Sequence, residues 1–69
     1  MVQVMEVSPE ARVELERMAR SPVLPHRKVV QATALLELAD GASVRSTARL
    51  LRTYPNTVAA WRDRFLGGR

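Results

Sequence analysis

The chain has 69 residues, a net charge of +4 and a hydrophobic content of 46%, which suits one folded domain spanning residues 1–69 and no more. It contains no cysteine and a single histidine, so a disulfide framework and a Cys-based zinc site are excluded. No apolar run is long enough to span a bilayer, and the N-terminal MVQVMEV lacks the basic region of a secretory signal. We therefore expect a cytoplasmic protein without a membrane partner.

The N-terminal part of the chain predicts a short arm followed by one amphipathic helix. Residues 1–7 alternate weakly, which predicts an arm in the form of an extended segment or a short strand, with a frayed terminus as the alternative. A helix is expected over residues 8–20, because Ser8 suits the capping position, Pro9 the first turn and Glu10 the positive end of the helix dipole. Its apolar face consists of Ala11, Leu15, Met18 and Ala19.

A second helix is expected over residues 26–39, after a segment with two prolines that no helix interior accepts. Its apolar residues wrap most of the way round, which is typical of a helix at the buried centre of a fold. Gly41 ends this helix, since glycine readily supplies the left-handed residue after a last turn. The apolar residues are Val29, Val30, Ala32, Leu35, Leu36, Leu38 and Ala39.

Two short helices joined by a tight turn complete the chain. Ser43 caps a helix over residues 44–51, and Pro55 opens a helix over residues 55–66, with the turn at 52–54. This spacing predicts a helix-turn-helix. The expected fold class is all-α, a compact bundle of about four helices whose last two form the helix-turn-helix.

The helix-turn-helix also concentrates the positive charge. Residues 41–69 hold six arginines against one acid, a net charge of +5, whereas residues 1–40 hold five bases against six acids, a net charge of −1. A basic helix pair of this kind favours double-stranded DNA as the partner. A solvated surface is the alternative for any one arginine. The candidate phosphate contacts are Arg45, Arg49, Arg52, Arg62 and Arg64.

Helical geometry divides the last helix into a core face and an outer face. Val58, Trp61 and Phe65 fall within an arc of about 60°, so we expect them in the core. The opposite direction would enter the major groove if this is a recognition helix. The candidate base contacts there are Tyr54, Asn56, Ala59, Ala60 and Asp63.

These outer residues carry different chemistries. An asparagine such as Asn56 reads adenine with two hydrogen bonds, and an alanine contacts the thymine methyl group. Asp63 would accept from a cytosine amino group or pair with a nearby arginine, and Asn56 could instead bond the turn. Tyr54 could also bond a phosphate through its phenol.

With these residues in view, the chain resembles the N-terminal helix-turn-helix domain of IS630-type (Tc1/mariner-like) transposases. The matching segments are SPEARVELERMARS, PHRKVVQATALLELADG, SVRSTARLL and NTVAAWRDRF. The resemblance implies a homeodomain-like fold with 44–51 as the supporting helix and 55–65 as the reader. The family usually has glycine where this chain has Arg52, so Arg52 would need an unusual backbone angle or a differently shaped turn. The family also tends to have basic residues where this chain has Ala59 and Ala60.

The resemblance does not imply catalysis by this chain. The full transposases carry three metal-binding acids in a downstream domain, and no segment of this sequence corresponds to it. We also find no nucleophile–base pair in the sequence, so we expect no enzyme activity, no cofactor, no metal and no small-molecule substrate.

We therefore expect binding of double-stranded DNA in the bacterial cytoplasm, at the nucleoid. The protein would act as a transposase DNA-binding domain or as a stand-alone regulator, with a homodimer as a further form. The alternative is a small helical module for protein interaction or dimerisation that does not bind DNA.

Overall fold

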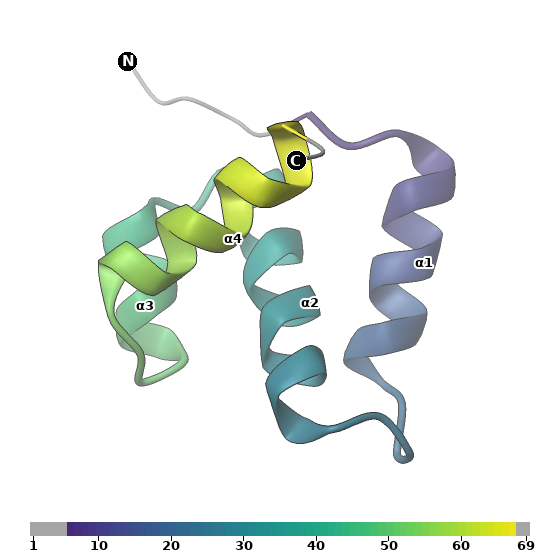
Figure 1. Ribbon diagram of the computed structural model, residues 1–69. Coiled ribbons are helices and arrows are strands. Elements are labelled where there is room, and N and C mark those ends of the chain that lie inside the picture. Colours follow the sequence, from purple (N-terminus) through teal and green to yellow (C-terminus); the bar gives the residue numbers. More distant parts are fainter. Residues whose placement is uncertain (1–5, 68–69) are drawn as a thin grey trace.

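The computed structural model describes residues 6–67, and within this range the chain forms four helices and no strand (Figure 1). The predicted all-α class is confirmed, and each helix ends within one residue of its predicted bounds. Residues 1–5 of the predicted arm and residues 68–69 lie outside the described residues. The helices are α1 (Pro9–Ala19), α2 (His26–Ala39), α3 (Val44–Leu50) and α4 (Pro55–Gly67).

Local sequence chemistry sets the starts of three helices. The Ser8 hydroxyl accepts a hydrogen bond from the Ala11 N–H at 3.1 Å, and the Ser43 hydroxyl accepts one from the Ser46 N–H at 3.0 Å. Each bond satisfies one of the amide donors that a first helical turn leaves without a partner. Pro55 is the first residue of α4, where its missing N–H is no loss.

The ends of α2 and α3 share one hydrogen-bond motif, in which the two residues after the helix cap bond back to the last turn. The first of these residues is left-handed in both cases, with φ of 99° at Gly41 and 57° at Arg52. The unusual backbone angle expected at Arg52 is therefore present. The bonds run from Gly41 N to Leu38 O (3.1 Å) and Ala42 N to Glu37 O (3.0 Å) after α2, and from Arg52 N to Arg49 O (3.3 Å) and Thr53 N to Ala48 O (2.9 Å) after α3.

Helix α2 lies at the centre of the fold and contacts each of the other three helices (Figure 1). Helix α1 runs antiparallel to it, and Arg12 near the start of α1 reaches Asp40 at the end of α2, with Nη2 and Oδ1 2.7 Å apart. Every helix contributes to the buried core. Of the apolar residues expected for α1 and α2, one from α1 and three from α2 lie in it, whereas Val29 and Val30 are half-buried outside it. The core residues are Leu15, Ala32, Leu35, Leu38, Ala48 and Val58.

The core face of α4 differs from the prediction at its last residue. Val58 is fully buried and Trp61 packs half-buried against the core. The placement of Phe65 in the core is wrong, because this side chain is 36% exposed. At the level of Phe65, α4 faces an open groove along α1 and α2 instead of a closed layer.

Thr47 shows a burial that the sequence did not predict. Its side chain is 1% exposed, and its hydroxyl has no hydrogen-bond partner among the described residues.

Candidate nucleic-acid interface

The predicted base-contact residues lie at the start of α4 and along its outer side. Asn56, Ala60 and Asp63 are exposed, and Ala59 is half-buried at the edge of this line. Val58 lies on the opposite side of the helix and is fully buried. The folded chain therefore brings these residues to one solvent-facing side of α4. Tyr54, directly before the helix, is 77% exposed.

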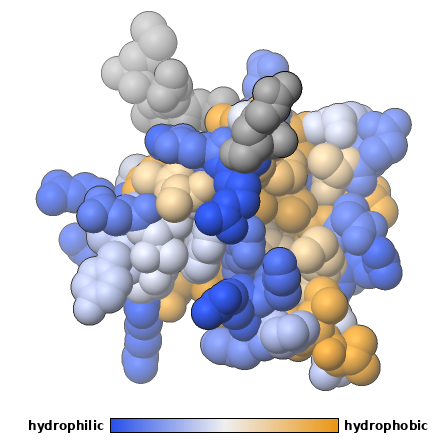
Figure 2. Space-filling model, viewed as in Figure 1, coloured by the Kyte–Doolittle hydropathy of each residue, from blue (hydrophilic) through white to orange (hydrophobic). Residues whose placement is uncertain are grey.

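The predicted phosphate-contact residues also lie at the surface. Arg45, Arg49, Arg52 and Arg64 are exposed, and none of them forms an ion pair with a carboxylate of the described residues. Figure 2 shows strongly hydrophilic side chains over the part of the surface formed by α3 and α4. Four guanidinium groups are thus available to a polyanion without breaking a bond in the protein.

Arg62 differs from the other four arginines. It is half-buried, and it donates from Nε and Nη2 to Asp63 Oδ1 at 3.1 and 3.0 Å. This contact partly neutralises Asp63, which would otherwise repel a phosphate. Both bonds use the same carboxylate oxygen, so Oδ2 stays free of hydrogen bonds from the described residues. An accepting oxygen for a cytosine amino group is therefore present on the outer side of α4.

One exposed residue beside the turn was missed from the sequence. Leu50, the last residue of α3, is 63% exposed, whereas the next residue, Leu51, is half-buried. Consecutive residues of a helix point about 100° apart, so both leucines cannot face the core. That spacing was the signal that one of them is a surface residue. Leu50 thus presents an exposed apolar side chain at the end of α3.

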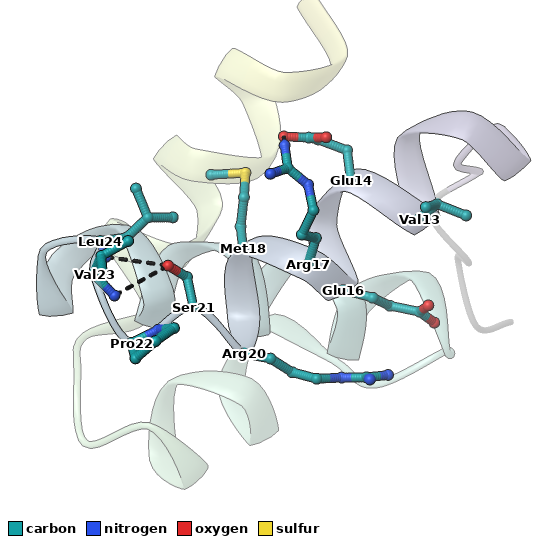
Figure 3. A pocket seen from close by; sticks show the side chains of 10 residues that line it. All are labelled: Val13, Glu14, Glu16, Arg17, Met18, Arg20, Ser21, Pro22, Val23 and Leu24. Carbon is teal, nitrogen blue, oxygen red and sulfur yellow. Dashed lines mark hydrogen bonds and ion pairs between the residues drawn. The ribbon is translucent and has the colours of Figure 1, made fainter.

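A hollow of the described surface lies away from these arginines. It has a volume of about 720 Å³ and is formed by the second half of α1 and the α1–α2 loop (Figure 3). Glu14 and Arg17 on its rim bond each other, and the Ser21 hydroxyl accepts from the N–H groups of Val23 and Leu24, both at 3.2 Å. The polar groups of this hollow are thus partly engaged within the protein, and none of them belongs to the predicted interface.

The described residues contain neither a candidate metal site nor a candidate membrane span. No cluster of three or more His, Cys, Asp or Glu side chains is placed to hold a metal ion within residues 6–67. None of the four described helices has the length and apolar character needed to cross a bilayer.

Comparison with known proteins supports the helix-turn-helix. A family model described as a homeodomain-like domain matches residues 25–69, a segment that contains α2, α3 and α4 and leaves α1 outside. No curated protein and no solved structure gave a match to the chain. Because the matched segment covers more than half of the sequence and coincides with three packed helices, this chain belongs to the homeodomain-like helix-turn-helix family.

Proposed function

We propose that this protein binds double-stranded DNA, with α4 in the major groove and the arginines of α3, the turn and α4 on the phosphate backbone. The observation that carries the proposal is the set of four exposed arginines without carboxylate partners among the described residues. They lie on α3, in the turn and on α4, and the outer side of α4 carries Asn56, Ala60 and Asp63. The homeodomain-like family, whose members place such a helix in the major groove, supports the same assignment.

The phosphate-contact residues and the base-contact residues would have different roles. Phosphate contacts set affinity and orientation, whereas contacts to base edges set sequence preference. Asn56 and the free oxygen of Asp63 supply the polar base contacts, and Ala59 and Ala60 allow a close approach to thymine methyl groups. Because only two polar side chains of α4 face the bases in this arrangement, we expect the electrostatic contribution to dominate the affinity.

The finer role follows the resemblance to IS630-type transposases. That resemblance includes the α1 segment, which the homeodomain-like match leaves outside. We infer that the chain supplies the DNA-binding module of such a transposase, recognising the terminal repeats of its element, or acts alone as a transcription regulator on the bacterial nucleoid. Both roles use the same interface and require binding without catalysis by this chain. A downstream coding segment with three metal-binding acids would distinguish the first role from the second.

A salt titration tests DNA binding directly. The anisotropy of a fluorescent mixed-sequence duplex is followed with increasing protein at several salt concentrations between about 50 and 200 mM. Four phosphate contacts predict that log affinity falls with log salt with a slope of about −3.6. The absence of binding at the lowest salt would refute the proposal.

A matched variant separates the interface from general positive charge. Arg17→Ala removes an arginine of α1 that already pairs with Glu14, and we expect it to leave affinity and salt slope nearly unchanged. Sedimentation of the same samples reports whether one copy or a homodimer binds each duplex.

A further inference from the structure

The chain builds the same helix ending twice, with glycine in one and arginine in the other. After α2 the left-handed position is held by Gly41, and after α3 it is held by Arg52. Both positions donate to the carbonyl three residues earlier, and both following residues donate to the carbonyl five residues earlier. The two turns therefore differ in the side chain at this position and not in their hydrogen bonds.

The arginine makes the second turn less stable than a glycine would. In the left-handed region the Cβ atom of an L-residue crowds the following carbonyl oxygen, and glycine has no Cβ. Among the described residues Arg52 is the only non-glycine residue with a positive φ. The motif itself uses main-chain groups alone, so it gives no reason for an arginine side chain.

Contacts within the protein give little reason for an arginine instead of a glycine at position 52. The Arg52 side chain is exposed and forms no ion pair with a described carboxylate. A cation after the last turn of α3 interacts favourably with the helix dipole, but this effect is small at an exposed site. The equivalent turn at Gly41 forms without it.

The exposed neighbours of Arg52 favour a contact between its side chain and a polyanion. The residue lies in the turn between the two helices of the helix-turn-helix, with exposed Arg49 before it and exposed Tyr54 after it. We propose that Arg52 is the phosphate-binding residue of this turn and that its side chain is kept at a strained position for that contact. On this proposal, which rests on the proposed function, the turn is weaker in folding and stronger in DNA binding than the glycine form would be.

Three substitutions at one position separate backbone strain from charge. Arg52→Gly removes both, so we expect the melting temperature to rise by about 4–8 °C, as relief of about 1 kcal/mol would give. The same variant should lose about 0.9 from the magnitude of the salt slope. Arg52→Ala should lose the same affinity without the gain in melting temperature. Arg52→Lys should keep both properties near those of the unchanged protein.

The turn after α2, which has glycine at the left-handed position, provides a matched control for strain. Gly41→Ala places a Cβ at a positive φ, so we expect a lower melting temperature.

Several outcomes would overturn the inference. If the glycine and alanine variants bind DNA with unchanged affinity and slope, Arg52 does not contact a phosphate. If Arg52→Gly fails to raise the melting temperature and Arg52→Ala lowers it, the arginine stabilises the fold and is not strained. If the unchanged protein binds no duplex at low salt, the proposed function fails and the phosphate role fails with it. If the unchanged protein and Arg52→Gly bind DNA equally well, the phosphate role of Arg52 is refuted while the proposed function stands.

Discussion

Replacing Thr47 with valine is expected to stabilise the protein. The Thr47 side chain is 1% exposed, and its hydroxyl has no hydrogen-bond partner among the described residues. A buried donor left without a partner costs about 1–3 kcal/mol relative to the solvated group. Valine has a similar shape and the same branching at Cβ, so it fills the same space without the polar atom.

The size of the effect follows from the burial. Since the whole side chain is inside the fold, most of the desolvation cost should be recovered, and we expect the free energy of unfolding to rise by about 1 kcal/mol. For a domain of this size that change raises the melting temperature by about 4–8 °C. Urea denaturation should show a higher midpoint with an unchanged slope, because the surface exposed on unfolding is nearly the same.

Two controls make this prediction specific. In Thr33 the hydroxyl does have a partner, since it donates to the Val29 carbonyl oxygen at 2.9 Å, so Thr33→Val should be neutral or lower the stability by up to about 1 kcal/mol. Thr47→Ser keeps the hydroxyl and removes a methyl group from the core, which should lower the stability by about 1 kcal/mol. A loss of stability in Thr47→Val, equal to that of Thr33→Val or greater, would show that the Thr47 hydroxyl is bonded in solution.

Three further predictions concern the core, the interface and pH. Trp61→Ala should lower the stability by about 2–4 kcal/mol in urea denaturation, and Phe65→Ala by less because that side chain is partly exposed; equal losses would contradict this assignment of the core face. Arg49→Ala should leave the melting temperature nearly unchanged and weaken anisotropy-measured binding at all DNA sequences alike, since the residue is exposed; a loss at one sequence only would exclude a phosphate role. The hydrogen bond from Arg17, aided by its charge, lowers the pKa of Glu14 in the folded protein, so this stabilisation is present above the ordinary carboxyl pKa and is lost as pH falls through the lowered value. Across that acidic range the melting temperature should therefore fall more steeply with decreasing pH for the unchanged protein than for Arg17→Ala. An identical pH dependence of the two melting temperatures would exclude the contribution.

The helices and their order could be predicted from the sequence because their signals are local. A serine before a first turn, a proline at a first helical position and a glycine after a last turn act over three to five residues. Their effect does not depend on the rest of the fold. The burial of Val58 was also predictable, since it lies at the middle of the apolar side of α4. The exposure of Asn56 on the opposite side follows from the same helical spacing.

The tertiary structure decided which residues near the ends of those helices meet a partner. Phe65 shares its helix face with Val58, but it lines an open groove along α1 and α2, so it stays partly exposed. The burial of the Thr47 hydroxyl depended on how α3 packs into the bundle. A local pattern specifies the direction in which a side chain leaves its helix, whereas the surface that it then meets is set by helices distant in the sequence.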